Sequence, residues 1–279
     1  STCIKCGTCV QVCPTGALID RVSAYQGHDK DLTEIKSVCV GCSVGCATKI
    51  MVRDNRIVRI EGDWEGAVNH GLLCEHGRYD PVTESRKRIT TPQIRKDGIL
   101  ETVSWEEALS TVASKLRPLA GAKNGIAAIA STRLPAEALN IFKELFADKF
   151  QSSLVTSIEE GVPTAVVTRY AEKNGAFEGK LDVLRNTDTV MCIGANISRS
   201  HMVVGFLFKR NLPKGTHLIN IDPEASDLDD LANIALKTNP ASDLALIRGL
   251  QAIIVKEGLG RSPLTLPDAD LLIEQAVSA

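Results

Sequence analysis

The spacing of the cysteines constrains this chain more than any other feature. Eight of its nine cysteines fall in two tight groups before Gly77. They are Cys3, Cys6, Cys9 and Cys13 in the first group, and Cys39, Cys42, Cys46 and Cys74 in the second. Although such groups can form disulfides in an oxidising compartment, Cys-x2-Cys repeats in a chain of 279 residues favour metal ligation. The sequence therefore predicts eight metal-ligating thiolates.

The first group has the spacing C-x2-C-x2-C-x3-C-P, which is the run found in bacterial ferredoxins. In two-cluster ferredoxins the fourth cysteine of the run ligates the other cluster. We therefore expect Cys3, Cys6 and Cys9 to share one 4Fe-4S cluster and Cys13 to serve another, whose remaining ligands would lie upstream. The sequence would then start inside a ferredoxin-like module. Zinc is the alternative, but it needs only four thiols and has no use for the Cys-Pro ending.

The second group has a C-x2-C-x3-C spacing with a distant fourth cysteine, which suits a 4Fe-4S cluster held by a loop and one remote ligand; zinc is again the alternative. Gly41 and Gly45 leave room for the backbone to approach inorganic sulfur. Residues 21–37 are polar without clear periodicity and are expected to be a connector. Between the ligands, Asp54-Asn55 is a turn signal that predicts a hairpin over residues 49–60.

Composition excludes several functions. With 32 basic and 34 acidic residues and 4% aromatic residues, the chain lacks the basic surface and stacking side chains of a nucleic-acid binder. No apolar run approaches the roughly 20 residues of a membrane-spanning helix. Such a chain is expected to work in the reducing cytoplasm. Cys192 lies alone in an apolar run and is expected to be a buried small hydrophobe.

Beyond residue 100 the pattern changes to alternating helices and strands. Ser104 is the expected N-cap of a helix that ends near residue 116, with Glu107 completing a capping box. Strands are predicted at residues 126–130, 153–156, 189–194 and 217–221, and helices at 135–150, 164–173, 201–211, 242–256 and 268–277. This order predicts a mostly parallel sheet covered on both faces, with ligands bound at the carboxyl ends of the strands.

These features resemble one known family. The segment from Cys39 to Arg78, followed by Arg88-Ile-Thr-Thr-Pro92, Asp97-Gly98 and Val103-Ser-Trp-Glu-Glu-Ala108, is similar to the N-terminal part of the molybdopterin oxidoreductase superfamily. With the ferredoxin run in front, it most resembles the formate dehydrogenase alpha subunit and the large iron-sulfur subunit of respiratory NADH dehydrogenases. The resemblance implies at least two 4Fe-4S clusters. For catalytic members it also implies a molybdenum or tungsten bis-molybdopterin guanine dinucleotide, which this chain is a candidate to bind.

The resemblance also implies an α/β fold in three parts. Residues 1–34 would be the C-terminal part of a ferredoxin-like iron-sulfur module. Residues 35–95 would be a small β-rich 4Fe-4S domain. Residues 96–279 would be a mostly parallel, Rossmann-like α/β sheet domain, cut short at its far end because superfamily members continue well past it.

Three residues are candidates for the guanine dinucleotide arm of the pterin. The loops that follow two predicted strands, residues 194–198 and 222–226, resemble those that bind it in the superfamily, which implies roles for Asn196, Asp222 and Asp243. The alternative is that these are ordinary strand-end turns. Glu224 stands where the family often has Arg, and a carboxylate facing a pyrophosphate is unfavourable unless it is neutralised.

The catalytic residues are less clearly marked. His76 stands where family members with molybdenum usually have a Lys between cluster and pterin; the alternative is a surface histidine beside a turn. The loop that would ligate the metal corresponds to residues 157–164, which contain neither Cys nor His. Glu160 or Ser157 would be an oxygen ligand there, and a hard oxygen ligand does not supply the thiolate chemistry expected for formate.

Two functions follow. The first is an electron-transfer subunit that relays electrons through 4Fe-4S clusters to or from an NADH-, ferredoxin-, hydrogenase- or quinone-linked partner in a larger oxidoreductase complex. The alternative is a catalytic molybdenum or tungsten enzyme of the formate dehydrogenase type, which exports electrons through the same clusters. His76, Glu224 and the missing thiol ligand favour the relay, with other redox subunits of a hetero-oligomeric complex as its partners. A zinc-binding scaffold without redox chemistry is a third hypothesis.

Overall fold

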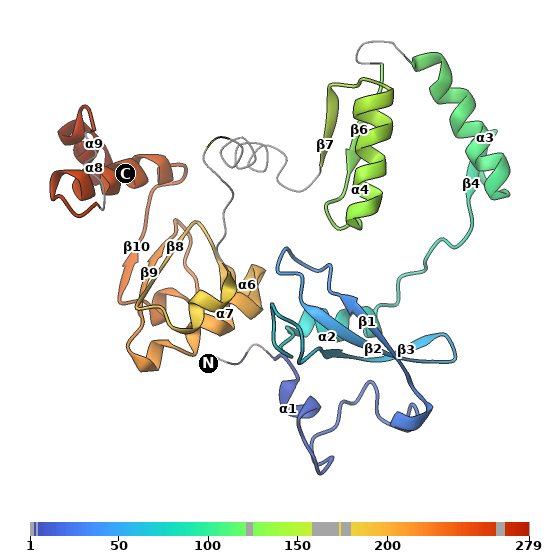
Figure 1. The fold of residues 1–279 in the computed structure, drawn as a ribbon, viewed down its shortest axis with the longest axis horizontal. Helices are drawn as coiled ribbons and strands as arrows, with labels where there is room; N and C mark the ends of the chain where they lie inside the picture. Colours follow the sequence, from blue (N-terminus) through green and yellow to red (C-terminus); the bar gives the residue numbers. More distant parts are fainter. Residues whose placement is uncertain are drawn as a thin grey trace. The chain divides into compact units, whose positions relative to one another are not determined.

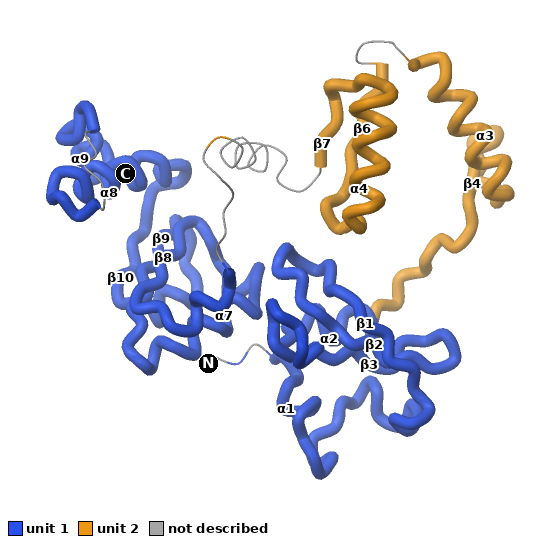
Figure 2. Tube along the Cα trace, in the orientation of Figure 1, with its two compact units in different colours: residues 1–83, 179–279 blue, residues 84–178 orange. Residues whose placement is uncertain are grey.

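The structure is a computed structural model that describes residues 3, 5–120, 125–157, 173, 180–260 and 266–278 (Figure 1). The chain divides into two compact units, each of which has most of its contacts within itself (Figure 2). One unit comprises residues 1–83 and 179–279, and the other comprises residues 84–178. Each unit is described separately below.

The first part of the larger unit is an antiparallel sheet in the order β1-β2-β3. Its elements are α1 (Thr8–Gln11), β1 (Thr33–Val38), β2 (Ala47–Arg53), β3 (Arg56–Gly62) and α2 (Glu75–Thr83). Asp54 and Asn55 form the β2–β3 turn with φ of 48° and 59°, as expected for a two-residue hairpin with both central residues left-handed, so the predicted hairpin is confirmed. The expected connector over residues 21–37 is wrong at its end, because β1 pairs with β2 there.

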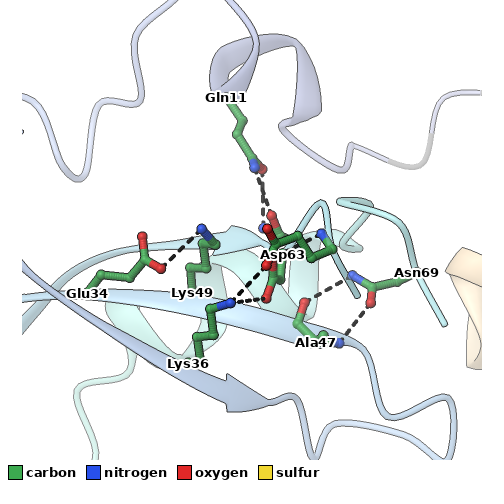
Figure 3. Close-up of polar contacts among 9 residues, drawn as sticks. Gln11, Glu34, Lys36, Ala47, Lys49, Asp63 and Asn69 are labelled. Atoms are coloured by element: carbon green, nitrogen blue, oxygen red, sulfur yellow. Dashed lines mark hydrogen bonds and ion pairs between the residues drawn. The ribbon is translucent and has the colours of Figure 1, made fainter. Parts of the chain in front are cut away.

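Acidic side chains surround two lysines that face each other on this sheet. Lys36 on β1 lies directly opposite Lys49 on β2. Lys49 pairs with Glu34 on β1 at 3.1 Å, and Lys36 reaches Asp63 and Glu65, beyond the end of β3, at 3.8 and 3.0 Å (Figure 3). These ion pairs offset the repulsion between the two facing lysines.

The second part of the larger unit is a parallel sheet in the order β10-β9-β8 with helices after its strands. Its elements are β8 (Thr189–Ile193), α6 (Ile197–Ser200), α7 (Met202–Lys209), β9 (His217–Ile221), β10 (Ile234–Leu236), α8 (Asp243–Lys256) and α9 (Ala269–Val277). Cys192 is 5% exposed and packs with Phe208, Leu218 and Leu228, which confirms that it is a buried hydrophobe.

The smaller unit contains a hairpin, two long helices and a parallel strand pair. Its elements are β4 (Gln93–Lys96), β5 (Ile99–Thr102), α3 (Trp105–Leu116), β6 (Ala127–Ala130), α4 (Ala136–Lys143), a π-helix (Glu144–Lys149) and β7 (Leu154–Ser157). Ser104 caps α3, since its side chain accepts a hydrogen bond of 3.1 Å from the Glu107 amide, as predicted. The β4–β5 hairpin and α2 were not predicted.

The predicted parallel pairing is confirmed, but the parallel strands that the structure describes form two separate sheets, one in each unit. The predicted helix over residues 164–173 lies outside the described residues, apart from Lys173. No helix in the described part of the chain is long and apolar enough to span a bilayer.

The end of β3 is packed backbone against backbone. A Cβ at Gly62 would lie 2.1 Å from the carbonyl oxygen of Gly71, and a Cβ at Gly71 would lie 2.0 Å from the Trp64 ring. Neither contact leaves room for a methyl group. This packing holds the segment before Cys74 against the sheet.

We predict that Gly62→Ala destabilises the larger unit by about 2 kcal/mol or more, because neither backbone segment can move without disturbing the sheet. The measurement is the shift in urea midpoint followed by circular dichroism. Gly16→Ala is the matched control, since a Cβ there meets nothing within 4 Å and only the φ of 66° opposes it, at a cost of about 1 kcal/mol. Equal losses in both variants would contradict the packing argument.

Candidate iron-sulfur centres and cofactor loops

The fold brings the second cysteine group together from two elements. Cys39, Cys42 and Cys46 lie in the β1–β2 connection, and Cys74 immediately precedes α2. The Cys39 amide donates to the Cys46 carbonyl at 2.8 Å, which closes the loop. Cys46 is 5% exposed and belongs to an apolar core against which Cys39 and Cys74 also pack.

The electrostatics of these thiols fit a bound cluster. Burial, with smaller contributions from the neighbouring Cys39, Cys42 and Cys74 thiolates, raises the pKa of Cys46 to about 12. Burial also raises the pKa of Cys74. Bare thiolates would therefore repel one another in this site, whereas bound iron reverses the balance because a coordinating thiol is deprotonated outright.

Backbone amides point at two of the sulfurs. The Gly41 amide donates to Cys39 Sγ and the Gly77 amide donates to Cys74 Sγ, each at 3.4 Å. A Cβ at Gly77 would lie 3.2 Å from Cys39 Sγ, so this glycine lets α2 approach the thiols closely. Among the described residues, no three His, Cys, Asp or Glu side chains gather around a single metal ion. An iron-sulfur cluster instead takes its thiolates at separate irons, and hydrogen bonds to the sulfurs tune its potential.

Asn69 holds the loop that carries Cys46. Its Oδ1 accepts from the Ala47 amide at 2.8 Å, and its Nδ2 donates to the Ala47 carbonyl at 3.0 Å and to the Leu72 carbonyl at 2.7 Å (Figure 3). The side chain is 0% exposed. Asn69 thus joins the residue after Cys46 to the segment before Cys74. Sequence reasoning missed it, because an isolated Asn carries no motif.

The first cysteine group surrounds the short helix α1. The Cys6 thiol donates to Thr8 Oγ1 at 3.1 Å, and Cys9 lies on α1. Cys13 Sγ accepts from the Leu18 amide at 3.4 Å, and this hydrogen bond, with a smaller contribution from Thr15, lowers the pKa of Cys13 to about 7. Cys13 is therefore prepared to act as a thiolate ligand. Its assignment to a cluster separate from that of Cys6 and Cys9 stays a prediction.

Two of the predicted pterin residues present unpaired polar atoms at the carboxyl ends of the parallel strands. Among the described residues, Asn196 Oδ1 and Asp243 Oδ1 are buried without a hydrogen-bond partner, and so are Ser198 Oγ and Thr238 Oγ1. A Cβ at Gly194 would lie 3.8 Å from Asp243 Oδ2, which places the start of α8 beside the loop after β8. Buried polar atoms normally have partners, so these atoms suit a polar ligand. Ser198 ends the loop of residues 194–198 that the family resemblance singled out, whereas the sequence offered no signal for Thr238.

Asp222 behaves differently. Its Oδ1 accepts from the Glu224 amide at 2.9 Å, as in an ordinary strand-end turn. Glu224 is exposed, and Lys237 Nζ donates to its carbonyl oxygen at 2.6 Å while pairing with Asp229 at 2.7 Å. Lys237 therefore places a positive charge in this loop, near the carboxylate that would oppose a pyrophosphate.

The structure describes two of the three catalytic candidates, His76 and Ser157. His76 is on α2, more than half exposed, and its Nδ1 lies 2.9 Å from Asp80 Oδ2 one turn later. Ser157 ends β7 in the smaller unit, and Glu160 lies outside the described residues. Their roles stay predictions.

A hydrogen-bonded chain links the cluster loop to the loop after β8. Ser43, next to Cys42, has its Oγ 3.0 Å from His201 Nε2. His201 Nδ1 lies 2.8 Å from Ser200 Oγ, which donates to the Asn196 carbonyl at 2.9 Å. The two candidate cofactor regions of the larger unit are therefore connected through side chains.

Comparison with protein families identifies the class of this chain. The family model described as molybdopterin oxidoreductase matches residues 88–263, and the molybdopterin oxidoreductase Fe4S4 domain matches residues 32–80. The 4Fe-4S binding domain matches residues 1–19. The chain belongs to the molybdopterin oxidoreductase family, which confirms the predicted class and the prediction of 4Fe-4S clusters as cofactors.

Individual relatives span several activities. An NADH-quinone oxidoreductase subunit of Rhizobium meliloti is 31% identical over 93% of this chain and 31% of its own length. Nitrate reductase of Symbiobacterium thermophilum is 33% identical over 81% of this chain and 31% of its own. The alpha subunit of the F420-dependent formate dehydrogenase of Methanocaldococcus jannaschii is 27% identical over 81% and 33%, respectively. The chain thus spans about a third of the length of these relatives.

Solved structures confirm the fold. Acetylene hydratase from Pelobacter acetylenicus aligns with a TM-score of 0.65 and 19% sequence identity, over 80% of this chain and 32% of that one. At this identity the likeness shows a shared fold alone. The mixed α/β architecture with an iron-sulfur segment agrees with the prediction.

We predict that Cys46→Ala removes the iron of the second group, whereas Cys192→Ala does not. Both cysteines are 5% exposed, so the two variants delete equally buried sulfurs and differ only in the proposed ligation. The measurement is iron per chain together with visible absorbance. Full iron content in Cys46→Ala would remove this cysteine from the ligand set.

We also predict that Asn69→Asp destabilises the larger unit. A carboxylate can accept from the Ala47 amide but cannot donate to the Ala47 and Leu72 carbonyls, and each unsatisfied buried group costs about 1–3 kcal/mol. The measurement is the urea midpoint, together with the rate of cluster loss on dilution. Asn55→Asp in the exposed β2–β3 turn makes the same chemical change and should be nearly neutral; a comparable effect there would show that added charge, not lost donors, is responsible.

Proposed function

We propose that this chain is an iron-sulfur electron-transfer subunit of a multi-subunit, formate dehydrogenase-like oxidoreductase. Its clusters, ligated by the eight N-terminal cysteines, would relay single electrons to or from an NADH-, ferredoxin-, hydrogenase- or quinone-linked partner. One observation carries the proposal: both cysteine groups lie in one compact unit, where Arg78, on the helix that follows Cys74, donates hydrogen bonds to the Cys6 carbonyl and to Gln11 beside the first group. Such an arrangement suits transfer between clusters. The reducing cytoplasm remains the proposed location.

The relatives support a role within a larger complex. The alignment with the NADH-quinone oxidoreductase subunit covers 93% of this chain, compared with 81% for the formate dehydrogenase subunit. The sequence departures point the same way, since residues 157–164 lack Cys and His and His76 replaces the usual Lys. We therefore propose other redox subunits as partners, and the boundaries at residues 34 and 95 stay part of this proposal.

A second candidate function has its own observation. Within the part of the chain that the structure describes, four buried polar atoms lack partners, on Asn196, Ser198, Thr238 and Asp243, in the segments that follow β8 and β10. They fit the polar arm of a pterin dinucleotide, which would hold molybdenum or tungsten and supply two-electron chemistry. Under this candidate the chain is part of a catalytic subunit that uses the same clusters to export electrons.

Metal analysis of the full-length purified protein separates the two functions. We predict abundant iron with neither molybdenum nor tungsten, as a relay subunit requires. Molybdenum or tungsten near one per chain would establish the catalytic candidate. Zinc in place of iron would overturn both. The control is a parallel measurement of Cys46→Ala, whose iron content should fall while any molybdenum or tungsten stays unchanged.

A further inference from the structure

Arg78 is a buried cation at the junction of the two cysteine groups. Its guanidinium donates three hydrogen bonds: Nε to the Cys6 carbonyl at 2.5 Å, Nη1 to the Ile60 carbonyl at 3.0 Å and Nη2 to Gln11 Oε1 at 2.8 Å. The residue is 6% exposed. One side chain therefore contacts the loop of the first group, helix α1 and strand β3 together.

The same residue is adjacent to the second group along the chain. Gly77 precedes Arg78, and its amide donates to Cys74 Sγ, while a Cβ there would lie 3.2 Å from Cys39 Sγ. Arg78 thus extends from the turn that contacts the second group's sulfurs to the backbone that carries Cys6. Arg78 is therefore adjacent to the second group along the chain and hydrogen-bonded to the first group through its side chain.

The charge of Arg78 has no paired carboxylate. Among the described residues, no Asp or Glu oxygen lies within ion-pair distance of the guanidinium, and its three acceptors are neutral. Burial lowers its pKa, while Tyr79, Cys6, Glu61 and Asp20 act in the opposite direction. Because arginine keeps its proton in proteins and a buried unpaired charge is costly, this cation requires a nearby anionic group. Thiolate-ligated clusters on either side would supply it.

The packing around Arg78 is too close to be a loose surface contact. Gly7 has φ of 65°, and a Cβ there would lie 2.3 Å from Tyr79 Oη and 2.7 Å from Arg78 Cδ. Gln11 adds a pair of hydrogen bonds with the Gly62 backbone, at 2.9 and 3.2 Å (Figure 3). The first group is therefore held against β3 and α2 by two polar side chains and one glycine.

We propose that Arg78 is a positioning residue between two iron-sulfur clusters: its hydrogen bonds fix the first cysteine group against the second, and its charge stabilises the reduced form of both clusters. The inference rests on the cluster ligands assigned in the proposed function. The step that it serves is the movement of one electron, in which one cluster is oxidised and the other reduced with no bond or proton transferred. A fixed positive charge between the clusters favours the added electron on either side.

The test compares Arg78→Gln with Arg78→Lys in the full-length protein. Both variants lose the planar fork that binds three acceptors, but only Lys keeps the charge. The measurement is a dithionite redox titration followed by electron paramagnetic resonance, with iron per chain determined on the same samples. Arg78→Gln should shift the reduction potentials of both clusters downward, and Arg78→Lys should restore most of that shift.

Gln11→Leu is the matched control for the packing of the first cysteine group against β3 and α2. It removes an Arg78 acceptor and the Gly62 contacts without changing charge, so it should weaken the magnetic interaction between the reduced clusters and leave the potentials nearly unchanged. Gly7→Ala keeps Arg78 and should weaken the same interaction by displacing the first group, which keeps the test usable if Arg78→Gln does not fold.

The outcomes separate this inference from the proposed function. Wild-type protein without iron-sulfur signals would end the proposed function. Iron-replete Arg78→Gln with wild-type potentials, or Gly7→Ala with an unchanged magnetic interaction, would overturn the role of Arg78 while leaving the relay intact.

Discussion

Desolvation of the Cys46 thiol is the constraint on which this structure depends. The sulfur is packed among apolar side chains and faces three further thiols, so its pKa rises to about 12. The neutral thiol packs there as a small hydrophobe, as Cys192 does elsewhere, but a bare thiolate in the same place would be costly. Four thiolates can be held together in this site when bound cations deprotonate the thiols and balance their charge. The closed β1–β2 loop and the approach of α2 through Gly77 are then consequences of gathering four sulfurs around one cluster.

Two buried polar side chains fix the irregular segments around this site. Asn69 binds the amide and carbonyl of Ala47, at the start of β2, and the Leu72 carbonyl, and Arg78 binds two carbonyls and an amide side chain. Backbone groups that no neighbouring strand or helix turn satisfies need such partners. Asn69 holds the second group internally, whereas Arg78 connects it to the first. One residue thus fixes the geometry of the second group, and a different residue connects the two groups.

The sequence predicted best what is local. The Asp54-Asn55 turn and the Ser104 cap each act within a few residues, and the structure places both as expected. The cysteine runs are also local motifs, and they fall within the regions that the iron-sulfur family models match. Strand β1 was missed because it is an exposed edge strand whose hydrophobic pattern is weak. Arg78 was missed as a contact because its partner Cys6 lies 72 positions away. Asp222, a position carried over from the family resemblance, accepts a hydrogen bond within its own turn, and its role at a pterin stays a prediction.

The unpaired atoms beyond β8 and β10 bear on how the two candidate functions are related. Each buried, unpaired polar group destabilises the folded state by about 1–3 kcal/mol. The four such groups among the described residues would therefore be costly in a protein that bound nothing at this end of the sheet. The chain from Ser43 through His201 and Ser200 to Asn196 joins that edge to the cluster loop. A relay and a catalytic subunit can therefore share the same scaffold up to Asn196. The two functions differ in what satisfies the polar edge: a pterin in one case, and in the other a further polar segment or partner of the complex.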